Sequence, residues 1–500
     1  MKLNKITIYN FRSIKELEFN IFDINSSNTY ALLGVNESGK SSFLRAITLI
    51  ECDETQLSYP HDFYDEKRSV IIKHEYICDD DLNKTLKQHL SKTFSFPKEI
   101  VDKVKVKSIE MIAEYTPDKE ITVTYVENIL FENKDFKEYK YSGKQIDKLS
   151  KEDFDFETPT LLDLNLYFKE NLDTYFWDYS NNIIFWKSSP EYLLLDEIEL
   201  SDFAVKPKKI SIPLLNCFIL SGYKENEIAQ EITLLTSPAK INSLQSLLSD
   251  KITAHINRIW PEHPISISFQ ISDNKISLLI EDNGIKYKPK TTDQRSDGFK
   301  QFISFLLTIS VENHNGELKN TILLIDEPEL HLHPLAQINL LKELIKITSN
   351  TKNNILFFAT HSNYLIDKDI LDRNFKVKKQ ENSFTSINRI EKKSSSYAEV
   401  NYDVFGIYST DFHNELYGFI EAEEVSLLEK LKKEKTWINA KTKKELTVSL
   451  SEYIRHSIHH PENKLNKKFT EDELRKSIKE LLKMKTEIEL KNKKVEGDNK

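Results

Sequence analysis

The sequence predicts an α/β protein with a mixed β-sheet that is covered by helices on both faces. Segments 322–325 and 355–359 contain apolar residues only, which is typical of parallel strands buried on both sides. A helical pattern lies between them. A third apolar strand, Tyr30 to Leu33, leads into a glycine-containing loop at 34–41 and then a helix over 42–50. This strand, loop and helix order is typical of α/β proteins that bind phosphate groups.

Composition and charge narrow the class of protein. The 500 residues, 39% of them hydrophobic, can form a sizeable core. The net charge of −9 provides no overall attraction to nucleic acid. Residues 421–500 nevertheless hold 20 Lys and Arg against 16 Asp and Glu. Solvated helix faces account for this tail most simply, and a basic nucleic-acid surface is the alternative.

Hydropathy and cysteine usage indicate a cytoplasmic protein with no membrane partner. The sequence has no apolar run of about 18 residues that would span a bilayer, and its N-terminus enters a strand pattern directly. Residues 3–8 and 17–21 alternate apolar and polar side chains, which predicts two half-exposed antiparallel strands. Cys52, Cys78 and Cys217 form no CxxC pair, so we expect reduced thiols and no zinc site.

Residues 34–41 read Gly-Val-Asn-Glu-Ser-Gly-Lys-Ser, which is a complete phosphate-binding loop. Its glycines let backbone N–H groups surround phosphate oxygens. Lys40 then reaches the β and γ phosphates, and the Ser41 hydroxyl coordinates Mg²⁺. The sequence therefore predicts ATP and Mg²⁺ as cofactors. The predicted nucleotide ligands from this loop are Gly34, Asn36, Glu37, Ser38, Gly39, Lys40, Ser41 and Ser42.

Two polar segments follow the later apolar strands and add catalytic groups. Asp326 ends one strand, where its carboxylate can join Ser41 in the Mg²⁺ shell. Glu327 beside it can orient or deprotonate the attacking water. His361 ends the next strand, at the edge of the sheet where ligands bind in α/β proteins. We therefore predict ATP hydrolysis with Glu327, His361 and Lys40 as the catalytic residues.

These motifs together resemble the ABC-type P-loop ATPases of the RecF, SMC and OLD group. The resemblance covers about residues 1–75 and 285–395. In that family a signature segment near Ser-x-Gly-x-x-Gln precedes a helix, and residues 295–301, Arg-Ser-Asp-Gly-Phe-Lys-Gln, stand in its place. The resemblance implies that Ser296 and Gly298 bind the γ-phosphate held by an opposite subunit. It therefore implies a homodimer with two composite sites.

The same resemblance assigns two more residues. His361 matches the family's switch histidine, which senses the γ-phosphate. Arg12, in Asn-Phe-Arg-Ser at 10–13, matches an opening motif whose arginine lies near the nucleotide, although an ordinary surface arginine remains the alternative. The family's glutamine loop has no clear counterpart, since Gln56 and the region of Asp62 match it equally poorly.

The chain divides by pattern into four segments. Residues 1–75 and 286–395 form the two parts of the ATPase core, 76–285 a large α+β insertion, and 396–500 an all-α C-terminal domain. In the last segment Thr470 and Glu473 predict a capping box at the start of a helix.

A second candidate site lies in the C-terminal segment. Arg455 and His460 fit the R-x₄-H pattern that marks HEPN ribonuclease domains, which are small all-α modules that cleave RNA without a metal. An imidazole can accept the 2′-hydroxyl proton while a guanidinium stabilises charge on the phosphate. The alternatives are a structural helix end closed by Pro461 and metal binding by the histidines.

The sequence as a whole predicts an ATP-binding and ATP-hydrolysing enzyme that acts as a nucleotide-switched dimer. The resemblance points first to bacterial anti-phage defence. The alternatives are a RecF-like DNA-binding ATPase in DNA repair, an ATP-gated HEPN-like ribonuclease, and a regulatory scaffold for an effector. The expected partners are ATP, a second copy of the chain and, depending on the alternative, DNA, RNA or a toxic effector protein.

Overall fold

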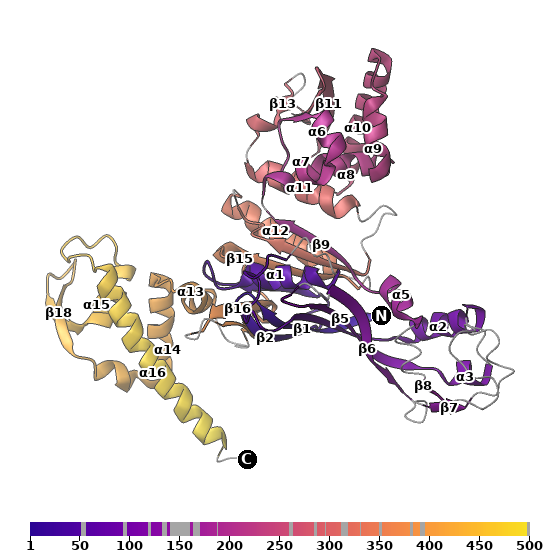
Figure 1. Cartoon of the computed structure of the whole chain (residues 1–500). Coiled ribbons are helices and arrows are strands. Elements are labelled where there is room, and N and C mark those ends of the chain that lie inside the picture. Colours follow the sequence, from indigo (N-terminus) through magenta and orange to yellow (C-terminus); the bar gives the residue numbers. More distant parts are fainter. Residues whose placement is uncertain are drawn as a thin grey trace. The chain divides into compact units, whose positions relative to one another are not determined.

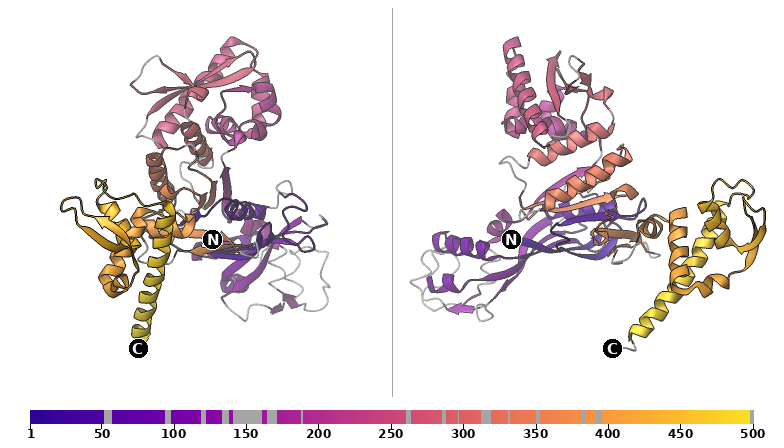
Figure 2. Two further views of the ribbon diagram at one scale, coloured as in Figure 1. Left: turned by 90° about the vertical axis from the view of Figure 1, so that its left-hand side faces the viewer. Right: turned by 180° about the vertical axis from the view of Figure 1, so that it is seen from behind.

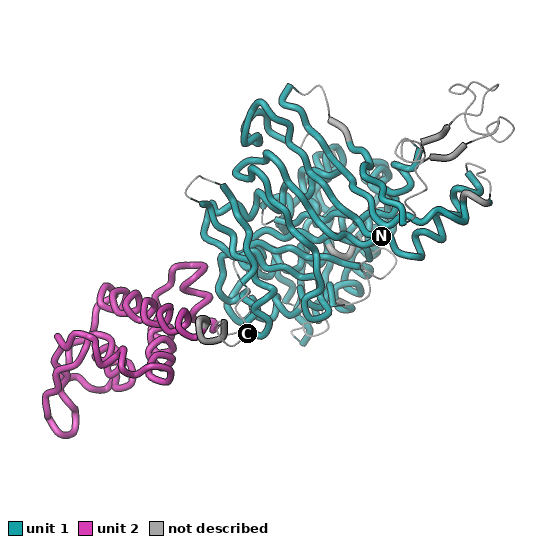
Figure 3. The backbone as a smooth tube through the Cα atoms, turned by 90° about the horizontal axis from the view of Figure 1, so that it is seen from below, with its two compact units in different colours: residues 1–391 teal, residues 392–500 magenta. Residues whose placement is uncertain are grey.

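The structure divides into two compact units, residues 1–391 (unit 1) and 392–500 (unit 2), each with its own hydrophobic core (Figure 3). It is a computed structural model. Within the described residues no helix is long and apolar enough to cross a membrane. The described residues are 1–51, 57–93, 98–118, 122–132, 138–140, 161–163, 171–187, 189–259, 264–284, 288–295, 297–311, 319–330, 332–349, 353–380, 384–390 and 396–497.

The centre of unit 1 is a six-stranded sheet in the order β17-β16-β3-β15-β14-β9. All its strands run parallel except β17, which pairs antiparallel with β16. β3, β14 and β15 are buried along nearly their whole length, as their unbroken apolar sequences predict. The strands are β3 (Thr29–Leu33), β9 (Asn182–Lys187), β14 (Thr321–Asp326), β15 (Ile355–Thr360), β16 (Asn374–Lys379) and β17 (Thr385–Arg389).

Helices cover both faces of this sheet (Figure 1). On one face lies α1 (Lys40–Thr48), where the ring of Phe43 packs 5.5 Å from that of Phe357 on β15. On the other face lies α12 (Pro334–Thr348), whose Thr348 hydroxyl lies 2.6 Å from that of Thr29 on β3. The predicted α/β core with a covered mixed sheet is therefore confirmed.

A second, antiparallel sheet packs on the far side of α1, in the order β2-β1-β4-β5-β6. Phe19 of this sheet contacts both Phe43 of α1 and Phe357, so the two sheets and α1 share one core. Both predicted N-terminal strands are present. The strands are β1 (Lys2–Phe11), β2 (Ile14–Asn20), β4 (Val70–Ile77), β5 (Val106–Tyr115) and β6 (Thr122–Phe131). Beside them are α2 (Asp80–Thr93), α3 (Lys98–Lys103), β7 (Glu138–Lys140), β8 (Leu161–Asp163) and α5 (Asp173–Asp178).

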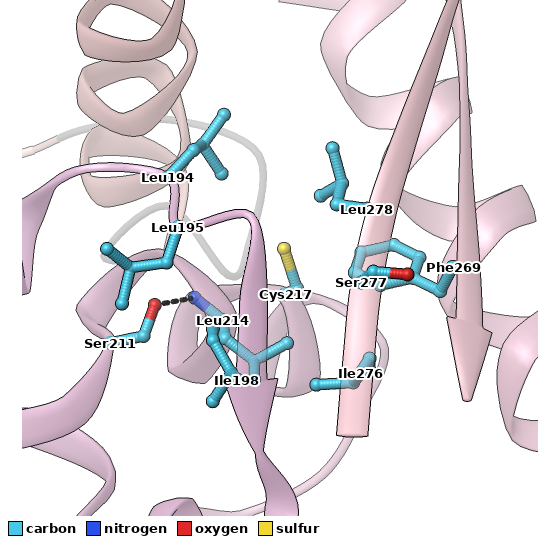
Figure 4. Close-up of a pocket in the computed structure, with 10 residues that line it drawn as sticks. All are labelled: Leu194, Leu195, Ile198, Ser211, Leu214, Cys217, Phe269, Ile276, Ser277 and Leu278. Carbon is cyan, nitrogen blue, oxygen red and sulfur yellow. Dashed lines mark hydrogen bonds between the residues drawn. The ribbon is translucent and has the colours of Figure 1, made fainter. Parts of the chain in front are cut away.

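The remaining part of unit 1 has a separate core around a small sheet in the order β10-β12-β11, with β13 beside β12. A void of about 20 Å³ lies within it, with the Cys217 thiol among apolar side chains (Figure 4). Burial raises the pKa of this thiol, so it stays protonated. The elements are β10 (Glu197–Glu199), α6 (Leu200–Val205), α7 (Pro207–Ile210), α8 (Ile212–Leu220), α9 (Glu225–Thr233), α10 (Pro238–Ile259), β11 (Ile265–Ser272), β12 (Lys275–Asp282), β13 (Lys290–Thr291) and α11 (Asp297–Val311).

Residues 76–285, which the sequence pattern groups as one insertion, are distributed over three parts of unit 1. β5 and β6 extend the antiparallel sheet, and β9 forms an edge of the parallel sheet with Ile183 opposite Ile322. Residues from about 194 onward build the separate core. Local periodicity identifies a strand but not its partner, and β9 pairs with a strand more than a hundred residues away.

Unit 2 contains a β-hairpin, which corrects the prediction that the C-terminal domain is all-α. β18 (Lys433–Ile438) reads Lys-Glu-Lys-Thr-Trp-Ile, and Trp437 is its buried residue, so charged side chains conceal the strand pattern. β18 pairs with β19 (Glu445–Ser449). The helices are α13 (Tyr397–Phe405), α14 (Thr410–Glu429), α15 (Leu450–His459) and α16 (Glu471–Gly497), the long yellow helix in Figures 1 and 2.

The predicted capping box of α16 is confirmed. The Thr470 amide donates to Glu473 Oε2 at 2.8 Å, and the Glu473 amide donates to Thr470 Oγ1 at 3.2 Å. Each bond satisfies an amide that would otherwise have no partner in the first turn. The apolar face that follows, with Leu474, Ile478 and Leu481, is buried in the core of unit 2.

A buried histidine in the same core makes the stability of unit 2 depend on pH. His413 Nε2 lies 2.9 Å from Ser477 Oγ, and burial, aided by the positive charge of Arg455, lowers the pKa of His413 to about 4. An unfolded chain binds this proton near pH 6.5. The contribution of neutral His413 to the free energy of unfolding is therefore fully present above pH 6.5. As the pH falls from 6.5 to 4, we expect the free energy of unfolding to decrease by up to about 1.4 kcal/mol per pH unit.

Urea unfolding at several pH values measures this slope. The His413→Asn variant keeps a polar side chain but has no titrating group, so its slope should be smaller than that of the wild type. The comparison of the two proteins removes the contribution of the other histidines. Equal slopes would contradict the assignment to His413.

Candidate nucleotide site

The carboxyl ends of three neighbouring strands bring the predicted site residues together. In β3 and β15, Leu33 lies opposite Thr360, and in β14 and β15, Asp326 lies opposite Ala359. The phosphate-binding loop, the Asp-Glu pair and the His361 segment each leave the sheet at this edge. Residues separated by more than three hundred positions thereby meet at one end of the parallel sheet, where ligands bind in such folds.

The loop itself has the curved backbone that a phosphate requires. Lys40 Nζ donates to the carbonyl oxygens of Gly34 and Val35 at 2.8 and 2.9 Å, so the ammonium lies inside the curve. Burial lowers the pKa of Lys40, and the carboxylates of Glu327 and Asp326 oppose this effect. Gly39 adopts φ of +103° at the start of α1, a conformation that side chains disfavour.

Thr385 supports the loop from the edge strand β17, and the sequence offers no signal for it. Its hydroxyl donates to the Ser38 carbonyl at 3.2 Å and lies 2.7 Å from the hydroxyl of Ser13. A Cβ atom on Gly39 would come within 2.1 Å of Thr385 Oγ1. Gly39 is therefore required both by its backbone angle and by the close approach of β17.

Asp326 and Ser41 form a donor set that fits Mg²⁺. The Ser41 hydroxyl hydrogen-bonds to the Asp326 carboxyl group, and burial raises the pKa of this carboxyl. Asp326 Oδ1 is buried and has no hydrogen-bond partner among the described residues. An oxygen in this state suits a hard cation, which takes its other ligands from water and phosphate oxygens. Ser41 and Asp326 would hold the ion, and the ion would neutralise charge on the phosphates.

Glu327 is held in a strained but well-defined position. Its φ is +55°, in the left-handed region, and its amide donates to the Ala359 carbonyl at 2.9 Å. His361 Nδ1 lies 3.3 Å from Glu327 Oε1. The His361 amide donates to Glu329 Oε1 at 3.0 Å, which links the end of β15 to the turn after β14. The structure thus places the predicted base and the predicted switch histidine next to each other.

A hollow of about 620 Å³ opens in front of these groups. Arg12 lines it, with Nε 2.6 Å from Asp62 Oδ1, so the structure places Arg12 beside the nucleotide loop. His61, Tyr64 and Lys379 also line the hollow, and they belong to no recognisable sequence motif. The lining residues are Arg12, Ser13, Asn36, Glu37, Ser38, Gly39, Lys40, Ser41, Ser42, His61, Tyr64, Glu327 and Lys379.

Comparison with known proteins agrees with this geometry. A family model described as "AAA ATPase domain" matches residues 1–366. The chain belongs to the AAA ATPase domain family. The ATPase is also 31% identical over 139 residues to the uncharacterized protein MJECL43 of Methanocaldococcus jannaschii, a match that covers 27% of the ATPase. The match covers 35% of that relative, so the ATPase spans about a third of its length.

Solved structures of SMC head domains are similar over most of the chain. One is the SmcHead bound to the C-winged helix domain of ScpA, with a TM-score of 0.40, 12% identity, and coverage of 79% of this chain and 100% of that one. Another is the SMC head domain from Thermotoga maritima, with a TM-score of 0.36, 12% identity, and coverage of 78% and 100%.

Each of the site residues can have a different role in ATP hydrolysis. Lys40, inside the loop, is placed to hold negative charge on the β and γ phosphates. The Glu327 carboxylate can accept a proton from the water that attacks the γ-phosphorus, and the adjacent His361 ring can hold that carboxylate in position. The bond between the γ-phosphorus and its bridging oxygen would then break, and ADP and phosphate would be released.

The segment predicted as the signature, residues 295–301, is connected through α11 to the turn that holds Glu327. Gly298 lies buried in the first turn of α11, whereas Ser296 lies outside the described residues. Arg295 Nη1 donates to both carboxylate oxygens of Asp282 at 2.8 and 2.9 Å, which fixes the chain just before the helix. Gln301 Nε2 donates to the carbonyl oxygens of Glu327 and Pro328, both at 3.3 Å.

We expect Gln301→Ala to lower ATP turnover about tenfold while leaving the affinity for ATP nearly unchanged. The variant loses two hydrogen bonds worth roughly 1 kcal/mol each, and they support the catalytic turn rather than the nucleotide. Steady-state kinetics separates kcat from KM. Gln245→Ala is the matched control. Gln245 Nε2 donates to the carbonyl of Phe269, a residue of the separate core, and not to the turn at Glu327. A change in KM alone would contradict the prediction.

Arg455 and His460 contact different elements of unit 2. Arg455 Nη2 lies 2.9 Å from Glu421 Oε2, and its guanidinium lies over the ring of Tyr417 on α14. His460 Nδ1 lies 3.5 Å from Glu462 Oε1, and its ring faces Trp437 on β18. Each side chain of the R-x₄-H pair is thus engaged by its own neighbours.

Proposed function

We propose that the ATPase works as an ATP-switched homodimer with two composite sites. Among the described residues that line the nucleotide hollow, none comes from α11, which carries the signature segment. This observation supports a site that a second copy of the chain completes. Gln301 would then transmit the partner's contact, because α11 and the catalytic turn at Glu327 are joined by its hydrogen bonds.

Exposed apolar side chains beside the hollow favour the same arrangement. Val35 within the phosphate loop is 54% exposed, and Leu335 at the start of α12 is 63% exposed. Both lie at the carboxyl edge of the parallel sheet, where an opposing copy would cover them. ATP, with Mg²⁺ held by Ser41 and Asp326, would join the two copies, and hydrolysis would release them.

Mixing two inactive variants tests the composite site. Lys40→Ala breaks the phosphate loop, and Ser296→Arg breaks the signature segment. An equimolar mixture should recover about a quarter of the wild-type ATPase rate, because half of the dimers are mixed and each has one intact site of two. Zero activity in the mixture, with both variants folded and the wild type active, would rule out sites shared between copies.

We propose anti-phage defence as the biological role, a proposal that rests on the resemblance to the OLD group. The unit beyond the ATPase core would connect the switch to an effector. Plating a panel of phages on bacteria that express the chain with its genomic neighbours tests this role. Fewer plaques with the wild type than with Lys40→Ala would support it, whereas equal numbers across the panel would contradict it.

A further inference from the structure

Charge is segregated within unit 2. Residues 410–429, which form α14, contain six acidic side chains and no Lys or Arg. Residues 430–468, which follow directly, contain eleven Lys and Arg against four Asp and Glu. The slight excess of basic residues in the tail of the chain therefore comes from the hairpin and its flanking loops. Solvated helix faces do not account for it, because most of these lysines lie outside helices.

Two loops carry these lysines to the same end of the hairpin. The Ile438 amide donates to Asn466 Oδ1 at 2.8 Å, and its carbonyl accepts from Asn463 and Asn466, both at 2.9 Å. Ile438 is the last residue of β18, so the loop at 463–468 is tied to the strand just before the hairpin turn. Lysines that are twenty or more residues apart in sequence thus lie on two loops that meet at one end of the hairpin.

The hairpin turn is held in place by hydrogen bonds to Asn439. Asn439 Oδ1 accepts from the amides of Lys441 and Thr442, both at 3.0 Å, and the Lys443 amide donates to the Asn439 carbonyl at 3.0 Å. These bonds hold the turn in one conformation. A preorganised turn loses less conformational entropy when a ligand binds to its lysines.

Six lysines on these two loops are exposed and have no carboxylate within 4.0 Å among the described residues. Several other lysines of unit 2 are ion-paired, for example Lys435 with Glu473 and Lys476 with Glu434. We name the six the hairpin lysines. They are Lys441, Lys443, Lys444, Lys464, Lys467 and Lys468.

We propose that the hairpin lysines form a binding surface for the phosphodiester backbone of nucleic acid. Their spacing over two adjacent loops suits a ligand with repeated negative charges, and binding would release counterions. Trp437 is only 4% exposed, so it offers no ring for base stacking and the surface should bind independently of base sequence. This proposal goes beyond the composite ATP site and does not depend on it.

A membrane is a less suitable partner for this surface. Among the described side chains on the hairpin and the 463–468 loop, Leu446 and Leu465 are the exposed large apolar ones, 50% and 46% exposed. Stable membrane association requires a broad apolar face as well as basic charge. The surface therefore fits a soluble polyanion better than a bilayer.

Fluorescence anisotropy with the full-length protein tests the proposal. The probes are labelled single-stranded DNA, single-stranded RNA and duplex DNA of mixed sequence, each titrated over a range of salt. In Lys441→Glu/Lys443→Glu/Lys444→Glu we expect affinity to fall at least about tenfold. The slope of log Kd against log salt should decrease by roughly 0.7 per lost contact for single strands and 0.9 for duplex DNA. The three probes show which nucleic acid is preferred.

Matched variants make the result specific. Lys209→Glu/Lys240→Glu/Lys251→Glu changes the net charge equally at exposed lysines of unit 1 and should keep wild-type affinity. Lys441→Arg/Lys443→Arg/Lys444→Arg should also bind normally, and circular dichroism with thermal unfolding reports that both units of each variant are folded. Equal losses in both glutamate variants would overturn the proposal. Binding to anionic vesicles without binding to any of the three nucleic acids would overturn it as well.

Discussion

Glu327→Gln should bind ATP normally and hydrolyse it roughly 10² to 10⁴ times more slowly than the wild type. The amide cannot accept the proton of the attacking water, yet it has nearly the same shape as the carboxylate. The unusual backbone of residue 327, with φ of +55°, and its amide bond to Ala359 do not depend on the side chain. The change should therefore remove chemistry without disturbing the fold.

The same variant should accumulate as a dimer when ATP is present. If hydrolysis separates the two copies, a protein that cannot hydrolyse ATP stays joined. Light scattering after gel filtration, with and without ATP, measures this shift in mass. Glu197→Gln on β10 is the matched control and should behave like the wild type. Wild-type turnover by the Glu327→Gln protein would contradict the assignment of Glu327 as the base.

Lys40→Ala should lose at least about a hundredfold in affinity for ATP, since the ammonium provides charge-assisted bonds to two phosphates. Lys40 is 5% exposed and already lies inside the loop, so no neighbouring lysine can take its place without moving the backbone. In the wild type, ATP should raise the melting temperature because it binds only the folded state. That increase should disappear in the variant.

Lys379→Ala serves as the control for Lys40→Ala, because it removes a different lysine from the same hollow. Lys379 lines the same hollow, but its side chain is exposed at the end of β16. A solvated charge contributes less than a buried one, so the variant should lose much less affinity. Isothermal titration with a non-hydrolysable ATP analogue measures both values. Equal losses would mean that the loop lysine has no special role in binding.

The catalytic and nucleotide-binding residues could be predicted because they belong to short sequence motifs. Each motif lies within a few residues, and each follows an apolar strand that is recognisable by itself, as with Asp326 after β14 and His361 after β15. The capping box at Thr470 is local in the same way. Such features depend on the backbone conformation of one segment, which nearby residues determine.

The contacts that support the phosphate loop and the turn at Glu327 could not be predicted, because they join distant parts of the chain. Thr385 touches Ser38 across 347 residues, and Gln301 reaches the carbonyl of Glu327 from a different element. Thr385 belongs to no recognisable sequence motif, and although Gln301 ends the predicted signature segment, that motif does not indicate that its side chain reaches the turn at Glu327. Their importance comes from position alone, since a hydroxyl or an amide at these points satisfies backbone groups next to the site.

The sequence by itself determined the α/β core, the phosphate-binding loop and the residues that can carry out hydrolysis. Only the tertiary structure decided that β9 joins the central sheet, that unit 2 contains a hairpin and that the hairpin lysines gather at one end of it. The physical reason is the range of the interactions. Periodicity and loop motifs report how a segment folds against its immediate neighbours, whereas strand pairing and clustered charge depend on which distant segments come together.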